Sequence, residues 1–164
     1  MPILSPHSLE VISRSAEQTR RVGMRLGGLL QPGDVVQLIG ELGSGKTTFV
    51  QGISAGWGSL DPVSSPTFVL VNVYRRLDHQ HLFHLDAYRL SGAQEAWDLD
   101  LDTMLESGIL LIEWADRIQE ALPAECLSAR LTYVDENQRD LLVEAHGRRY
   151  EILLEAFRKG IYGG

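Results

Sequence analysis

A phosphate-binding pattern occupies residues 40–47, which read Gly-Glu-Leu-Gly-Ser-Gly-Lys-Thr and match G-x-x-x-x-G-K-T. Glycines allow backbone conformations and close approaches that a side chain would forbid, so successive N–H groups can point into one anion-sized hollow. Lys46 adds a positive charge near the β- and γ-phosphates, and the Thr47 hydroxyl is suited to ligate the Mg²⁺ ion that bridges them. The pattern predicts a nucleoside triphosphate site with Mg²⁺. Its predicted nucleotide contacts are Leu42, Gly43, Ser44, Gly45, Lys46, Thr47 and Thr48.

The segments on either side of this loop have the patterns that a phosphate site needs. Residues 35–39 are apolar and read as a short buried parallel strand, and residues 46–53 read as a helix. The positive end of that helix dipole would face the phosphates. A chance glycine-rich turn between a strand and a helix is the alternative, and the Lys-Thr pair and the two flanks disfavour it.

Two carboxylates stand at the ends of apolar strands. Ligands of open α/β sheets bind beyond the carboxyl ends of the strands, where such acids would lie. Glu113 follows the apolar run 109–112 and could hold Mg²⁺ directly or through water. Asp86 ends a second strand and could orient or deprotonate the attacking water. From the residues alone the two roles could be exchanged, and either acid could be no more than a helix cap.

Several other side chains invite a chemical role. Three histidines lie close together, but the alternation of a strand places His84 on the opposite face from His79 and His81, which argues against a metal site. Trp114 follows Glu113 and either packs the edge of the sheet or belongs to the site. None of the paired arginines near residues 75 and 148 has the character of an arginine finger.

The pattern of the whole chain predicts an α/β fold. Ser15 and Gln18 form a capping box for a helix through Leu30, and a polar turn near residues 78–80 joins two strands into an antiparallel hairpin. The sheet is predicted to be mixed and mainly parallel, flanked by helices, as in P-loop NTPases. The other predicted elements are strands at 9–13, 68–75, 82–85, 108–112, 130–134 and 141–145 and helices at 93–105, 117–122 and 150–157.

Length and composition indicate one domain. The 164 residues, 44% of them hydrophobic and 23% charged, suffice for a single hydrophobic core over residues 1–164. Residues 159–164 are glycine-rich and are expected to fray unless a partner orders them. No apolar run approaches the length of a membrane span, the start lacks a secretory signal, and the single Cys126 excludes an internal disulfide. These features predict a cytoplasmic protein without a membrane partner.

The formal net charge of −7 bears on nucleic-acid binding. Nonspecific affinity for a phosphate backbone comes chiefly from lysine and arginine, which are fewer in this chain than aspartate and glutamate. Any connection to RNA is therefore expected to be indirect.

Beyond the phosphate loop, three further motifs follow in order: Ser65-Pro66-Thr67-Phe68, the segment 84–90 that reads His-Leu-Asp-Ala-Tyr-Arg-Leu, and Glu113-Trp114. Over nearly its whole length the chain resembles the TsaE family, formerly YjeE, small bacterial ATPases needed to make threonylcarbamoyladenosine on tRNA. Three positions differ from the usual family residues: Glu41 and Ser44 replace Asp and Ala, and Ala115 replaces Pro. The last change makes the conformation after Trp114 harder to predict.

The resemblance implies specific roles. Thr47 and Glu113 would ligate Mg²⁺, and Asp86 would serve hydrolysis of ATP. The segment Ser65, Pro66 and Thr67 would form a switch near the γ-phosphate, while Thr19 and residues 137–139, which include Arg139, would approach the nucleoside. The family acts with two partners, TsaD and TsaB, which carry the tRNA and the transfer chemistry, while its own ATP hydrolysis supports multiple turnover.

Three other functions compete with a partner-dependent ATP hydrolase. A small-molecule kinase uses the same loop but normally needs an arginine-rich lid and an acceptor pocket, and the sequence shows neither. A GTP-dependent switch would carry an N-K-x-D motif and a D-x-x-G segment after a strand, which the chain lacks. A binding scaffold with little hydrolysis stays open, because the sequence reveals phosphate binding more plainly than rate.

Overall fold

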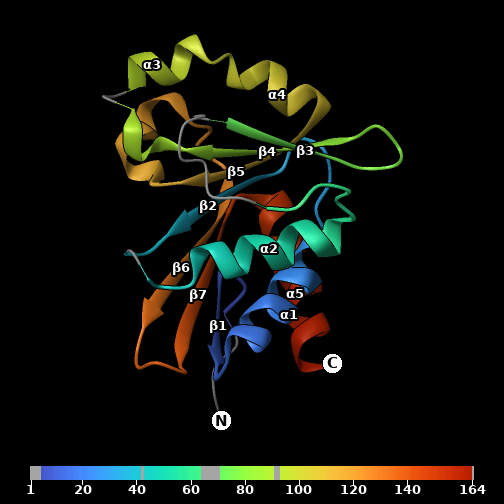
Figure 1. The fold of residues 1–164 in the computed structure, drawn as a ribbon, viewed down its shortest axis with the longest axis vertical. Coiled ribbons are helices and arrows are strands. Elements are labelled where there is room, and N and C mark those ends of the chain that lie inside the picture. The colour runs from blue at the N-terminus through green and yellow to red at the C-terminus, as the bar shows by residue number, and fades with distance from the viewer. Residues whose placement is uncertain (1–4, 42, 64–70, 91–92, 164) are drawn as a thin grey trace.

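The protein is built on a seven-stranded sheet with the order β1-β7-β6-β2-β5-β4-β3 (Figure 1). The structure, a computed structural model, describes residues 5–41, 43–63, 71–90 and 93–163. Strands β6, β2, β5 and β4 pair in parallel, whereas β7 and β3 are antiparallel to their neighbours. The predicted mixed, mainly parallel sheet with an antiparallel hairpin is confirmed. The strands are β1 (Ser8–Ser13), β2 (Val35–Ile39), β3 (Val71–Arg75), β4 (His81–Asp86), β5 (Gly108–Glu113), β6 (Cys126–Tyr133) and β7 (Arg139–His146).

Helices cover both faces of the sheet, and each face has its own hydrophobic cluster. Alternation along β2 divides its side chains between them: Val36 and Leu38 pack with α1, α2 and α5, and Val35 packs with α3, α4 and η2. This two-sided burial explains why the central strands read as continuous apolar runs. The helices are α1 (Ala16–Gly27), α2 (Lys46–Trp57), α3 (Ala93–Asp98), α4 (Leu101–Ser107) and α5 (Arg148–Tyr162), with 3₁₀ segments η1 (Ala87–Arg89) and η2 (Ala115–Ala121).

Glycines bring α1 and α2 into very close contact. A Cβ atom added at Gly27, Gly52 or Gly56 would lie 2.0 Å from a backbone carbonyl oxygen of the opposing helix. No side chain fits in that space, so the two helix backbones pack directly on each other. This contact fixes α2, the helix that follows the phosphate loop.

Several predicted boundaries are wrong, and three of the differences have a local cause. Helix α1 ends at Gly27 rather than Leu30, because the poor helix formers Gly27 and Gly28 are followed by a tighter turn. The single helix expected at 93–105 is divided into α3 and α4, because Asp100 takes a left-handed conformation with φ 56°. Strand β6 begins at Cys126, four residues before the predicted start, because it pairs on both sides from its first residues.

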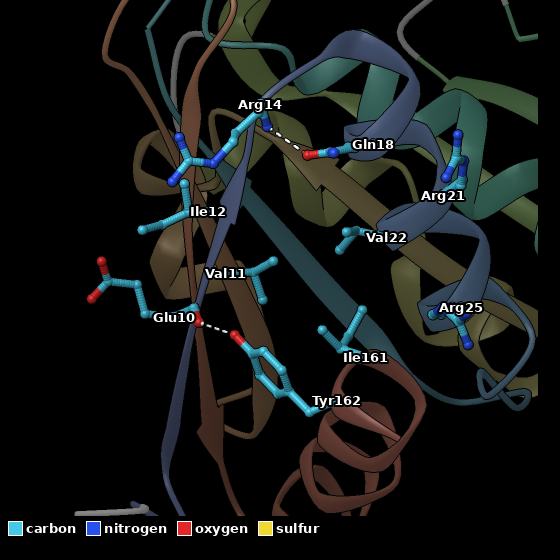
Figure 2. Close-up of a pocket in the computed structure, with 10 residues that line it drawn as sticks. All are labelled: Glu10, Val11, Ile12, Arg14, Gln18, Arg21, Val22, Arg25, Ile161 and Tyr162. Atoms are coloured by element: carbon cyan, nitrogen blue, oxygen red, sulfur yellow. Dashed lines mark hydrogen bonds between the residues drawn. The ribbon is translucent and has the colours of Figure 1, made fainter. Parts of the chain in front are cut away.

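The C-terminal segment is ordered further than the sequence suggests. Helix α5 runs from Arg148 through Tyr162, beyond the predicted 150–157, and so includes residues 159–162 of the segment that is expected to fray. The Tyr162 hydroxyl donates to the Glu10 carbonyl at 2.9 Å, and the Arg158 guanidinium donates to the Ser8 carbonyl at 2.9 Å. Both acceptors belong to the edge strand β1, which α5 therefore protects. Figure 2 shows the groove beside this contact, between β1, α1 and the end of α5.

Among the described residues, no helix combines the length and the apolar character that crossing a membrane requires.

Candidate functional site

The loop between β2 and α2 has the backbone that the glycine pattern predicts. Gly43 and Gly45 have φ values of 83° and 99°, in the left-handed region that favours glycine. A Cβ atom at Gly40 would lie 2.5 Å from the Ser44 Oγ and 2.7 Å from the Leu131 carbonyl oxygen. Helix α2 begins at Lys46, as predicted, with its N-terminus at the loop. Leu42 lies outside the described residues.

The two candidate acids lie side by side at the carboxyl edge of the sheet. In the register of the parallel strands, Asp86 of β4 is level with Glu113 of β5, and Glu113 is level with Leu38 of β2. Because β2 leads directly into the phosphate loop, both carboxylates are neighbours of that loop. The structure thus brings together residues that are 27 positions apart in sequence, Asp86 and Glu113.

Lys46 is the buried cation of this site. Burial lowers the pKa of Lys46 below its ordinary value, and the nearby carboxylates of Glu113 and Asp86 oppose that shift. Its ammonium group donates to the Gly40 carbonyl and lies 4.2 Å from the centroid of the Trp114 ring. One positive charge thus faces two carboxylates beside a glycine-rich loop, an arrangement suited to a polyphosphate and a divalent cation.

Trp114 contacts this loop from the end of β5. Its backbone is left-handed, with φ 60°, and its ring packs against Tyr88 at 5.2 Å between centroids. Ala115, where the family usually has proline, is fully buried and begins η2. The segment η2 that follows is kinked at Ile118, whose backbone angles (φ −132°, ψ 27°) are not helical.

The two acids differ in their hydrogen bonds. One carboxylate oxygen of Glu113 lies 2.7 Å from the His84 Nε2, and the Glu113 side chain is 12% exposed. One oxygen of Asp86 accepts from the Tyr88 N–H at 3.0 Å and caps η1, so the helix-cap interpretation is true of Asp86 in part.

His84 is the residue whose importance sequence analysis missed. Alternation correctly separated it from His81, which is on the other face of β4. In the described part of the chain, no group of three or more His, Cys, Asp or Glu side chains could hold a metal ion. The same alternation places His84 and Asp86 on one face, beside Glu113. The two-residue spacing between His84 and Asp86 was therefore the signal in the sequence that could have identified His84.

A small cavity beside α2 gathers the residues that the resemblance places near the nucleoside. Thr19, Gly45, Thr48 and Arg139 all line it. The Thr19 hydroxyl is buried, 2.7 Å from the Ser13 hydroxyl, and the Arg139 guanidinium packs on Tyr133. The Arg139 Nε and the Ser44 Oγ are buried without a hydrogen-bond partner among the described residues. Both are polar atoms that a bound nucleotide could contact.

The proposed switch residues Ser65, Pro66 and Thr67 lie outside the described residues. The chain just before them is anchored, because the Asp61 carboxylate accepts from the Arg75 backbone N–H at 2.8 Å and from its guanidinium at 3.0 Å. That guanidinium lowers the pKa of Asp61 below its ordinary value. The groove of Figure 2 contains none of the predicted site residues.

The fold and this loop define a P-loop protein: a strand, a glycine-rich turn and a helix stand at the carboxyl edge of a mainly parallel sheet. A family model described as threonylcarbamoyl adenosine biosynthesis protein TsaE matches residues 13–141. The chain belongs to the TsaE family.

Individual relatives agree with this assignment. The chain is 38% identical over 140 residues to the tRNA threonylcarbamoyladenosine biosynthesis protein TsaE of Bacillus subtilis, covering 85% of this chain and 87% of that protein. It is 46% identical to the TsaE protein of Streptomyces coelicolor over 114 residues, covering 68% and 77%. The crystal structure of Bacillus subtilis YdiB superposes with a TM-score of 0.77 and 31% identity, covering 94% of this chain and 96% of that one.

Proposed function

We propose that this protein is a Mg-ATP-binding P-loop ATPase that supports threonylcarbamoyladenosine modification of tRNA by acting on a TsaD–TsaB-type complex. The names of its relatives support the pathway, since they are tRNA threonylcarbamoyladenosine biosynthesis proteins. The observation that carries the chemistry is the meeting of Lys46, Glu113 and Asp86 beside the phosphate loop.

The loop and the first turn of α2 would hold the polyphosphate. Lys46 would exchange its contacts with the Gly40 carbonyl and the Trp114 ring for the β- and γ-phosphates. The buried Ser44 hydroxyl and the N-terminus of α2 lie where phosphate oxygens would bind. The nucleoside would lie toward Thr19 and Arg139, which line the neighbouring cavity.

Glu113 and Thr47 would hold Mg²⁺ together with phosphate oxygens. Mg²⁺ usually binds through one or two protein oxygens, with phosphates and water completing its shell, so a site of this kind needs no closed cage of side chains. The ion would neutralise charge that develops on the transferring phosphoryl group. Asp86, the neighbouring acid, would orient the attacking water with its second carboxylate oxygen.

The partner assignment follows from charge and family. A chain with a net charge of −7 is poorly suited to grip tRNA over a broad face, so the partners would carry the RNA. Hydrolysis by the isolated chain would be slow. Such a site accelerates phosphoryl transfer mainly by positioning the water and neutralising charge on the phosphates, and a partner could complete both.

The test is ATP turnover with and without a TsaD–TsaB complex, with the fate of the γ-phosphoryl group followed by labelling. We expect slow release of inorganic phosphate from the chain alone and a clear increase with the complex. Rapid, partner-independent transfer of the label to a small metabolite would contradict the proposal and favour a kinase. Equal binding of GTP and ATP would favour a nucleotide switch instead.

A further inference from the structure

Three side chains on adjacent strands form a chain of hydrogen bonds that ends at Glu113. His84 of β4 lies 2.7 Å through its Nε2 from the Glu113 carboxylate of β5. Its Nδ1 lies 3.0 Å from the Tyr74 hydroxyl of β3. The His84 side chain is only 2% exposed, so both ring nitrogens are withdrawn from solvent and use these partners.

The chemistry of the carboxylate fixes the direction of the bond between His84 and Glu113. An ionised carboxylate can only accept, so the hydrogen between His84 and Glu113 belongs to Nε2. In a neutral imidazole the other nitrogen is then an acceptor, and the Tyr74 hydroxyl is the donor to it. In this arrangement Glu113 fixes the tautomer, His84 directs its Nε2–H at Glu113, and Tyr74 satisfies Nδ1.

The contact also restricts how Glu113 can move. A glutamate side chain at the end of a strand has several rotamers, and ordering it as a metal ligand costs conformational entropy. The bond from His84 engages one oxygen of Glu113 and leaves the other outside that contact, and the carboxylate is close enough to Lys46 to act on its charge. Partners of this kind are known to orient metal-ligating carboxylates and to strengthen metal binding.

We propose that His84, oriented by Tyr74, is a positioning residue that holds Glu113 ready to ligate Mg²⁺. The inference rests on the proposed function, since it takes Glu113 as the Mg²⁺ ligand. If His84 were only a satisfied polar residue of the core, its loss would change stability but not the affinity for the metal.

The experiment measures the affinity for a non-hydrolysable ATP analogue as Mg²⁺ is added, in wild type and in His84→Ala. The quantity compared is the Mg²⁺ concentration at which half of the gain in affinity is reached. We expect His84→Ala to raise that concentration by about 10- to 100-fold, while the affinity for the analogue in EDTA stays within twofold. In a Glu113→Ala background, His84→Ala should have no further effect, because its target is gone. Tyr74→Phe should act in the same direction by a smaller factor.

His84→Gln is the rescue variant, since its amide N–H reaches about as far as Nε2 and should restore much of the Mg²⁺ affinity. Tyr74→Phe, which removes only the hydroxyl next to the His84 Nδ1, carries the test if His84→Ala does not fold. An unchanged Mg²⁺ dependence in folded His84→Ala, or in Tyr74→Phe where His84→Ala does not fold, overturns the inference. A full additional effect of His84→Ala in the Glu113→Ala background overturns it as well. Failure of the wild type to bind the analogue is a different result, which removes the proposed function itself.

Discussion

At the residue scale, the site separates two carboxylates that the sequence left interchangeable. Glu113 is held by the buried His84, which suits a group that must keep one orientation toward a metal ion. One oxygen of Asp86 accepts from the Tyr88 N–H and caps the short segment η1. This difference supports the proposal that Glu113 ligates the metal ion and that Asp86 orients the water.

Replacing Asp86 tests this division. We expect Asp86→Asn to keep Mg-ATP binding within a few-fold and to lower ATP turnover by about 10²- to 10⁴-fold, the usual contribution of a general base. Turnover with the partner complex and nucleotide affinity are measured on the same preparation. Asp98→Asn, at the exposed end of α3, is the matched control and should be neutral. Wild-type hydrolysis in Asp86→Asn would remove Asp86 from this role.

At the scale of elements, α2 is held in place by backbone contact with α1. Gly52 lies where an added Cβ would be 2.0 Å from the Arg20 carbonyl oxygen. Gly52→Ala must therefore push the two helices apart, and we expect a loss of about 1–3 kcal/mol in the free energy of unfolding. Because α2 carries Lys46, nucleotide affinity should fall as well. Chemical denaturation and nucleotide titration measure the two effects.

Gly160→Ala provides the control for Gly52→Ala. Gly160 lies within α5, and apart from its chain neighbours and its own helix backbone no atom of the described residues comes within 4 Å of its added Cβ. Alanine there should stabilise the protein by about 0.5–1 kcal/mol, since it restricts the unfolded chain. If both alanines had the same effect, close packing of α1 and α2 would not be the reason for glycine at 52.

The end of α5 makes a second element-scale prediction. Tyr162→Phe removes the donor to the Glu10 carbonyl on the edge of β1. We expect faster amide hydrogen exchange in the last turn of α5, with a loss of about 0.5–1.5 kcal/mol at most in local opening free energy. Tyr133→Phe is the control, because that ring packs on Arg139 and its hydroxyl makes no hydrogen bond to the described residues. Unchanged exchange in Tyr162→Phe would mean that the bond does not order the helix end.

Much of the fold could be predicted because its signals are local. The strand before the loop, the start of α2 and the end of β5 at Glu113 all follow from apolar runs and from residue types at fixed positions. The break at Asp100 could not be predicted, since an aspartate rarely takes a left-handed conformation and nothing nearby in sequence demands it.

The contact between His84 and Glu113 shows the same limit within the site. It exists because β4 lies beside β5 in a particular register, and strand order is set by the packing of the whole sheet. Alternation along one strand predicts which face of the sheet His84 occupies, but it does not predict which residue of the adjacent strand His84 contacts. The motif residues were thus predictable, while the partner that orients one of them was not.

At the scale of the whole molecule, the net charge of −7 predicts weak binding to RNA. The isolated chain should show no measurable affinity for tRNA at physiological salt in a fluorescence anisotropy titration, whereas tRNA should associate once the TsaD–TsaB complex is added. Tight, salt-sensitive binding of tRNA by the chain alone would contradict the indirect role proposed for RNA.

Nucleotide binding by the phosphate loop underlies every role proposed for this site, and calorimetric titration of Mg-ATP tests that binding directly. We predict that the wild-type protein releases or absorbs heat on saturable binding of one nucleotide. The Lys46→Ala variant, though folded, should bind at least about 100-fold more weakly, because it loses a buried charge-assisted contact. A folded wild-type protein that binds no adenine nucleotide, or a Lys46→Ala variant that binds as tightly as wild type, would contradict it.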